Sequence, residues 1–438
     1  MRPADRVSDY SETFVKYVIC KKYLSISFLA AGSYKKKCLQ TYYFKLVEVC
    51  SFVPVFIVLI TDEPPFNVFS SSLTEIILRP KNLAIIDQIY QKNVLTFRWQ
   101  IVWRNVLAFV YLHVASIYAL YLVFMGRFVV TLNIFIYTTY LNLCLCIVLT
   151  AGAHRLWAHR AYKARWPLRL FLAVMQTMAF QNHIYEWVRD HRVHHKFTET
   201  DADPHNAKRG FFFSHMGWLM VRKHKEVFEK GASVDMSDLE KDPIVMFQKK
   251  TYLVVMPLLC FFVPSYIPVA LWDESPWSSW YVASILRYTL TLHFTWLVNS
   301  AAHIWGNRPY DKYIGATDNK AVAICAFGEG WHNYHHVFPW DYKAAELGNY
   351  STNLSTALID WAAKYGLAYD LKTVSADMIK KRVSRTGDGS HPTDHKNKKS
   401  LEDHDHHHPE NPVWGWDDRD MPDEERQLAE IAHRAKQS

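Results

Sequence analysis

Long apolar runs alternate with strongly polar stretches along this chain of 438 residues. Four of these runs are close to the length of a membrane-spanning helix, which needs about 20 apolar residues. They cover roughly 102–125, 129–151, 252–272 and 280–302. We therefore predict an all-α membrane protein with four transmembrane helices. Arg287 lies within the fourth run, and we expect it to face protein rather than lipid.

The basic residues predict how these helices are oriented. The stretch 152–250 is rich in Lys and Arg, whereas the short connections 126–128 and 273–279 contain only Arg127. Loops on the cytosolic side carry more Lys and Arg than loops on the opposite side. We therefore expect 152–250 to be cytosolic. The region after the fourth run should be cytosolic as well, because two spans separate it from that loop.

The chain divides into three predicted regions. Residues 91–385 form the membrane domain, and residues 1–90 precede it as an atypical extension whose role no motif indicates. Residues 386–438 are polar and charged, with a histidine tract at 403–408, and are predicted to be a disordered cytosolic tail.

Composition narrows the possible partners. The formal net charge of +8 suits nucleic acid or an anionic membrane surface, and the apolar runs favour the membrane, so we expect no nucleic-acid partner. The seven Cys are odd in number and contain no CxxC pair, which argues against a disulfide framework. The 22 His stand out from an otherwise ordinary composition.

Three histidine clusters carry the candidate chemistry. An HxxHH string places its histidines on one helical face, so we expect their imidazoles to point to one place. All three clusters fall on the predicted cytosolic side, and eight histidines suit two metal ions better than one. Neutral imidazole binds iron, copper and zinc. The clusters are His154 and His159; His191, His194 and His195; and His332, His335 and His336.

The strings around these clusters resemble the membrane fatty acyl-CoA desaturases, specifically the stearoyl-CoA desaturase type in its insect-like form. The resemblance covers about 102–385, and the closing VWGWDDRDM (413–421) is similar to the tails of insect members. It implies four transmembrane helices with a cytosolic helical cap that holds a histidine-rich di-iron site. The matching strings are TAGAHRLWAHR (150–160), EWVRDHRVHHKF (186–197), DPHNAKRGFFFSHMGW (203–218), WLVNSAAHIWGNRPYD (296–311) and GEGWHNYHHVFPWDY (328–342).

The resemblance also implies which residues hold the two iron ions. The family uses nine histidine ligands and one asparagine that acts through water. His303 and Asn299 enter the set only through the NSAAH string. By matching position the metal ligands are His154, His159, His191, His194, His195, His303, His332, His335 and His336, with Asn299 through water.

The same resemblance implies a substrate site. Polar and basic residues would contact the acyl-CoA headgroup, since Arg binds phosphate through two hydrogen bonds. These residues are Asn105, Asn182, Arg189, Arg222 and Lys223. Three further residues would line a bent apolar tunnel for the acyl chain, namely Trp187, Thr295 and Trp296.

The implied enzyme is an oxidoreductase that uses O2 and two Fe2+ ions to insert a cis double bond into a saturated long-chain acyl-CoA, at carbon 9 by default. The sequence contains no GxGxxG after a strand, no CxxCH and no HPGG signature. The electrons should therefore come from a separate protein, and the resemblance implies that this donor is cytochrome b5 with its NADH-cytochrome b5 reductase. The expected location is the endoplasmic reticulum membrane, multi-pass, with the catalytic face and C-terminus cytosolic.

Two alternatives remain open. A related membrane di-iron fatty acyl hydroxylase uses similar histidine clusters. A metal-binding or metal-transporting membrane protein would place histidine ligands at mid-membrane depth. Only His113 and His293 lie within the predicted spans, and the tract at 403–408 is a further weak metal-binding candidate.

Overall fold

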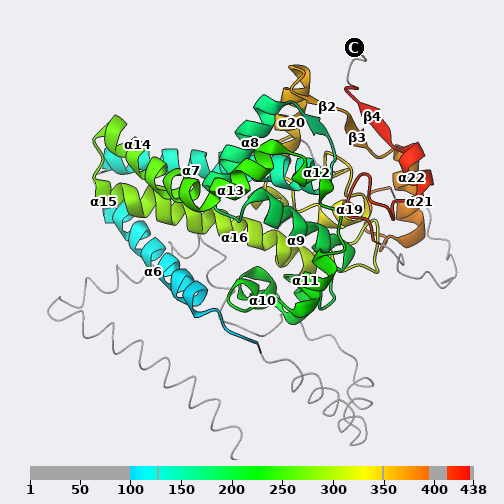
Figure 1. Ribbon diagram of the computed structural model, residues 1–438, viewed down its shortest axis with the longest axis horizontal. Helices are drawn as coiled ribbons and strands as arrows, with labels where there is room; N and C mark the ends of the chain where they lie inside the picture. Colours follow the sequence, from blue (N-terminus) through cyan, green and yellow to red (C-terminus); the bar gives the residue numbers. More distant parts are fainter. Residues whose placement is uncertain (1–98, 126–127, 348–349, 394–411, 435–438) are drawn as a thin grey trace, which may run out of the picture. The chain divides into compact units, whose positions relative to one another are not determined.

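The computed structural model is mostly helical, and the elements described below lie within one structural unit, Asn93–Ser438. The predicted extension 1–90 and the histidine tract 403–408 lie outside the described residues, so their interpretation stays a prediction. Figure 1 shows the arrangement of the labelled elements. The structure describes residues 99–125, 128–347, 350–393 and 412–434.

Among the described residues, three helices are long and apolar enough to cross a membrane. The second continues past its predicted end at 151 as a π-helix, and the third begins at Pro243 rather than near 252. The three helices are α6 (Trp103–Met125); α7 (Phe128–Leu149) followed by η2 (Thr150–Ala158); and α13 (Pro243–Pro257), η5 (Leu258–Phe262) and α14 (Val263–Trp272).

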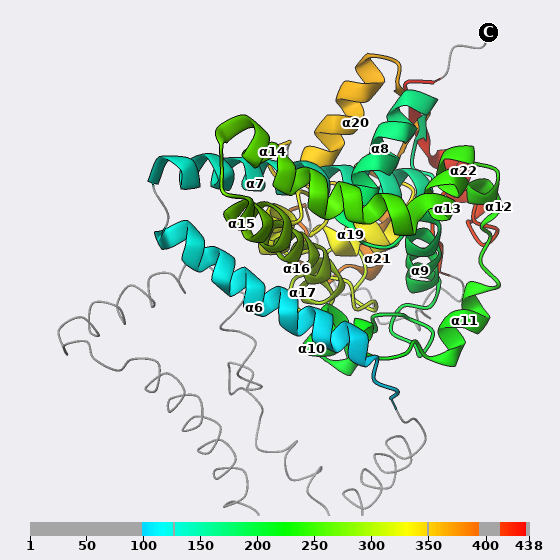
Figure 2. The same cartoon turned by 60° about the vertical axis from the view of Figure 1, so that its left-hand side comes forward.

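The fourth predicted span forms a helix that is more polar than the other three. It consists of α15 (Pro276–Ser279), η6 (Trp280–Leu286) and α16 (Arg287–Asn299), and α17 (Ala301–Ile304) follows it. It packs against α6 and α7, and Figure 2 shows α16 between α6 and α13. Its polar residues Thr289, Thr291 and His293 are buried. The number of spans therefore remains a prediction.

Arg287 connects this helix to its neighbour. Pro264 has no N–H with which to bond the carbonyl of Cys260 one turn earlier. The Arg287 guanidinium replaces that donor, since its Nη2 lies 2.6 Å from the Cys260 oxygen. Arg287 is fully buried, which confirms that it faces protein.

Shorter helices and loops gather at the end of the long helices where η2 and α17 lie. Local sequence sets their ends: Asp242 caps α13 by accepting from the Ile244 N–H, and Pro167 stands in the first turn of α8. The elements are α8 (Trp166–Ala179), α9 (Ile184–Lys196), η3 (Ala207–Arg209), α10 (Phe211–His215), η4 (Gly217–Leu219), α11 (Lys225–Gly231), α12 (Ser237–Glu240), α18 (Lys320–Cys325), α19 (His332–Val337), α20 (Leu354–Lys364) and α21 (Ala376–Thr386).

The tail after 386 is not disordered throughout, and that prediction is wrong for 412–434. This segment contains α22 (Asp423–Leu428) and β4 (Glu430–Ala432), and β4 pairs antiparallel with β3 (Leu371–Thr373). Trp414 is only 2 % exposed, so apolar packing fixes a segment of otherwise polar composition. A second short pair joins β1 (Lys163–Ala164) and β2 (Ala368–Tyr369).

Candidate metal centre

The histidines predicted as ligands lie together in two groups, and within each group the candidate ligand atoms are within 4.8 Å of one another. They come from four places in the chain: the end of η2, α9, α17 and α19. The first group contains His154, His159, His191, His195 and His335. The second group contains His194, His303, His332 and His336.

Each HxxHH string contributes to both groups, so the expectation that its imidazoles point to one place is wrong. His191 and His195 belong to the first group, whereas His194 belongs to the second. Adjacent helical residues project about 100° apart, so a short helix between two groups can serve both. The third cluster divides in the same way, with His335 in the first group and the other two in the second.

Distances within the groups match those around a metal ion. Ligands about 2.1 Å from an ion and at right angles to each other are about 3.0 Å apart. The Nε2 atoms of His154 and His335 are 2.9 Å apart, and those of His332 and His336 are 3.1 Å apart. The Nε2 atoms of His303 and His332 are 3.0 Å apart. The spacing therefore fits imidazoles that converge on a cation.

The outer nitrogens of three imidazoles have acceptors that fix which nitrogen carries the proton. The Nδ1 of His154 lies 2.9 Å from Glu329 Oε2, and the Nδ1 of His194 lies 2.9 Å from Asp203 Oδ1. The Nδ1 of His159 contacts the main-chain oxygen of Trp414. Each Nδ1 therefore carries the proton, and each Nε2 presents a lone pair to its group. Converging lone pairs form a cation site.

The protonation state also suits metal binding. Burial lowers the pKa of His191, His195 and His335 well below the usual value for histidine, and the neighbouring imidazoles lower it further. The same two causes lower the pKa of His332 and His336. These imidazoles are neutral near pH 7, which is the form that binds metal.

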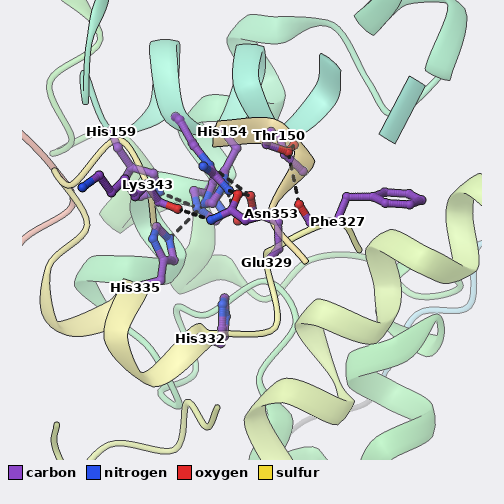
Figure 3. Close-up of polar contacts among 12 residues, drawn as sticks. Thr150, His154, His159, Phe327, Glu329, His332, His335, Lys343 and Asn353 are labelled. Carbon is purple, nitrogen blue, oxygen red and sulfur yellow. Dashed lines mark hydrogen bonds and ion pairs between the residues drawn. The ribbon is translucent and has the colours of Figure 1, made fainter. Parts of the chain in front are cut away.

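Glu329 lies next to His154 of the first group (Figure 3). Burial raises the pKa of this carboxyl, but Arg155 and His154 lower it more, so the net pKa is well below its usual range. Arg155 Nη2 lies 2.6 Å from Glu329 Oε1, and both side chains are buried. Arg155 also donates to Asn353 Oδ1 at 3.1 Å. Glu329 is thus an anion that fixes His154 and balances a buried cation.

Main-chain hydrogen bonds to two buried side chains position α19, which carries the third histidine cluster. Asp318 Oδ1 accepts from the Asn333 N–H at 2.9 Å, at the start of the helix. The Asn333 side chain accepts from the Tyr310 N–H at 2.9 Å and donates to the Ala316 oxygen at 2.9 Å. The loop before α19 is therefore attached to a residue inside the HNYHH string.

Sequence reasoning missed several groups that contact the histidines. Glu329 and Asp203 lie inside strings that the family resemblance already contained, so their charge next to histidine was an available signal. His205 was also missed, and its ring centroid is 4.3 Å from that of His194. Burial and the nearby His194 lower the pKa of His205 to about 3.

Replacing Asp203 with alanine should weaken metal binding at the second group by about 10–100-fold, because the outer partner of His194 is lost. Competition with an iron chelator, followed by metal analysis, measures the effect. Asp201→Ala is the matched control, since Asp201 lies in the same loop but is exposed and pairs with Arg209 at 2.7 Å. Equal retention of metal by both variants would contradict the assigned role of Asp203.

A mostly apolar cavity of about 440 Å³ adjoins the first histidine group. His191 and Asn299 line one end of it, and Phe261 and Ile285 line it at η5 and η6. The volume is that of an ordinary small-molecule site. Five of the predicted substrate residues line this cavity: Asn105, Asn182, Trp187, Thr295 and Trp296.

The three predicted basic contacts lie outside the cavity lining. Lys223 Nζ contacts Asp190, which does line the cavity, and Arg189 Nη2 lies 3.0 Å from the same carboxylate. Arg222 is exposed, and its N–H donates to the Gln100 oxygen at 2.9 Å. Asp190 thus connects two of the basic residues to the cavity wall.

Together, the apolar helices, the two buried histidine groups and the adjoining apolar cavity define a membrane protein with a candidate metal centre. Residues 132–346 match the family model described as fatty acid desaturase. The chain is 58% identical over 341 residues to an acyl-CoA Delta-9 desaturase of Acheta domesticus, covering 78% of this chain and 89% of that protein. It is 53% identical over 293 residues to stearoyl-CoA desaturase 5 of Homo sapiens, covering 67% and 87%.

A third relative is an acyl-CoA Delta12-desaturase of Acheta domesticus, 57% identical over 332 residues that cover 75% of this chain and 85% of that protein. The chain therefore belongs to the fatty acid desaturase family, among the acyl-CoA desaturases that include the stearoyl-CoA type. It is an oxidoreductase, and its family and apolar helices make it a membrane protein.

Proposed function

We propose that this enzyme inserts a cis double bond into a saturated long-chain acyl-CoA, with carbon 9 as the default position. The observation that carries the proposal is the pair of buried histidine groups, the first of which adjoins an apolar cavity. Similar proteins are named for positions 9, 11 and 12. Carbon 9 is proposed because it is the position named for the relative at 58% identity.

We propose that the nine histidines hold two Fe2+ ions, five at one ion and four at the other. Asn299 would complete the smaller set through water, since it lines a cavity together with His194 and His332. When bound, the two ions supply the redox chemistry that reduces O2 and oxidises an unactivated C–H bond. The neutral imidazoles act as ligands and not as general bases.

The residues around the cavity would orient the substrate. Trp296 is nearly buried and packs edge-to-face on Phe109, and Gln181 Nε2 donates to Thr295 Oγ1 at 2.9 Å. A wall with fixed rotamers restricts the acyl chain to one bent path, so one pair of adjacent carbons lies near His191. The reaction takes two hydrogens from these carbons and, with two electrons and two protons from outside, converts O2 into two waters.

The same proposal includes four spans, a cytosolic histidine-bearing face in the endoplasmic reticulum membrane, and electrons from cytochrome b5 and its reductase. The close packing of η6 and α16 between the three apolar helices supports the fourth span. The concentration of all nine histidines at one end of the long helices supports a single catalytic face.

The contacts of the membrane histidines favour an enzyme over a metal transporter. The Nε2 atoms of His113 and His293 are 3.1 Å apart, and the Nδ1 of His293 lies 3.0 Å from Nε2 of His215. The three rings form a chain in which His293 uses both of its nitrogens. Ligands for a transported ion would instead converge on one point.

Expression in a desaturase-deficient yeast should give new monounsaturated acids, and His194→Ala should abolish them, because the second group loses one of its four histidines. Gas chromatography after derivatisation of the double bond identifies the product and the carbon. His433→Ala is the control, since this side chain is exposed and belongs to neither group. Hydroxylated acids from an iron-loaded protein would favour the hydroxylase, and no product at all would overturn the proposal.

A further inference from the structure

The C-terminal segment Pro412–Met421 lies against the main chain of His159. The Trp416 N–H donates to the His159 oxygen at 2.9 Å, and the Trp414 oxygen contacts His159 Nδ1. One stretch of chain thus contacts both the backbone and the imidazole of a single residue. The inner nitrogen, Nε2, is 2.9 Å from Nε2 of His191 in the first histidine group.

Gly415 allows this close approach. A Cβ at this position would lie 2.5 Å from the His159 oxygen and 2.7 Å from its Cα. Real carbon atoms do not come this close to main-chain atoms, so any larger residue would push the segment away. The two tryptophans on either side can therefore reach His159 only because glycine separates them.

Trp414 is fixed in place by two arginines. Its ring lies 4.0 Å from the Arg192 guanidinium and 4.9 Å from that of Arg160, which is the distance range of cation–π contacts. The main-chain N–H of Trp414 donates to Asp418 Oδ2 at 2.9 Å, which closes a turn. Arg192 is buried on α9, the helix that carries the second histidine cluster. The tail therefore connects that helix to His159.

A second attachment lies one turn further along α9. Lys196 Nζ is 3.1 Å from Asp418 Oδ2 and also contacts Asp420. Lys196 directly follows His195, a member of the first group. The segment is therefore held from both sides of the first histidine group, by the end of η2 and by α9.

We propose that residues 412–421 form a clamp that positions His159 for metal binding. The Trp414 carbonyl keeps the proton on Nδ1, so the lone pair of Nε2 faces the first group. The Gly415 turn holds the main chain of His159 in place. The clamp rests on the proposed function, because it matters only if the first group binds iron. Trp414 is a positioning residue and does not itself contact the acyl chain.

The contacts of the clamp predict an effect on one ion only. Among the described residues, the clamp contacts His159 of the first group, whereas the outer nitrogen of His194 in the second group contacts Asp203. Loss of the clamp removes the acceptor of a single ligand. Loss of such an outer partner lowers metal affinity by about 10–100-fold. The first group should therefore lose iron before the second.

The test compares the unsubstituted protein with three full-length variants, Gly415→Val, Trp414→Phe and Arg419→Ala, each purified in detergent. Gly415→Val should lower the iron content from about two to about one per chain under chelator challenge and remove one of two Mössbauer components. Trp414→Phe keeps the carbonyl and an apolar ring and should retain both. Arg419 is 80% exposed in the same segment, so Arg419→Ala should match the unsubstituted protein.

The outcomes separate the two hypotheses. If the unsubstituted protein binds no iron, the proposed function is wrong, and the clamp, which depends on it, is wrong as well. If the unsubstituted protein binds two irons and Gly415→Val keeps both with an unchanged spectrum, the clamp is wrong. If Gly415→Val loses both irons together and melts earlier, the segment has a general structural role, which also overturns the clamp.

Discussion

Glu329→Ala is expected to destabilise the protein by about 3–5 kcal/mol and to abolish turnover, because it leaves a buried guanidinium without its counter-ion. Arg155 is 1 % exposed, and its Nη2 lies 2.6 Å from the carboxylate that the substitution removes. The same carboxylate lies 2.9 Å from His154 Nδ1, so the first histidine group also loses an orienting partner. Thermal unfolding and iron content measure the two losses separately.

Two further variants separate the effect of Glu329 on stability from its effect on iron binding. Glu240 is an exposed carboxylate that accepts from the Tyr185 hydroxyl, so Glu240→Ala should leave stability and iron content unchanged. Replacing both partners, Arg155→Met with Glu329→Leu, should restore much of the stability, since no buried charge remains unpaired. It should not restore tight iron binding, because His154 still lacks its acceptor. Full iron binding in the double variant would contradict this role for Glu329.

Ile285→Trp is expected to shift the products toward shorter acyl chains. Ile285 lines the cavity at η6, whereas Asn299 lines it at the end of α16, about 21 Å away at 1.5 Å per helical residue. A larger side chain there shortens the cavity without contacting the histidines. Each excluded methylene is worth about 10–200-fold in kcat/KM. Competition between acyl-CoA substrates of different length measures the shift.

A matched substitution outside the cavity tests whether position matters rather than added bulk. Leu271 lies on α14 and is 69% exposed, so Leu271→Trp enlarges a side chain that the cavity does not include. Its chain-length preference should equal that of the unmodified protein. An unchanged preference in Ile285→Trp would show that the acyl chain does not extend to η6.

The helices and the histidines were predictable because their signals are local. Apolar runs of membrane length predicted three of the helices. The strings that resemble the desaturase family identified all nine histidines as members of one site. The fourth helix was harder to assign from composition, since Arg287 and His293 are buried among protein and not exposed to lipid. Polar residues inside a bundle lower the hydropathy of a helix, so its composition alone does not decide whether it spans the membrane.

The division of the histidines into two groups was not predictable from spacing alone. A shared helical face suggested one target for each HxxHH string, but His194 and His195 are adjacent and project in different directions. The packing of α9 against η2, and the contact of its His194 ring with His303 on α17, decide which group each ring joins. The outer partner of His159 was still less predictable, because a main-chain carbonyl is present at every residue. A pair of tryptophans in a polar tail was the one local signal of its packing.

The contact between His159 and Trp414 spans 255 positions of the sequence. A ribosome that adds about 5–20 residues per second needs about 13–50 s to cover that interval. Throughout this time the first two spans are already made, but the residue that orients His159 does not yet exist. A chain that ends before Trp414 thus contains His159 and His191 but lacks the carbonyl that orients His159. If the first group binds iron as proposed, the clamp can orient His159 only after translation has passed Trp414.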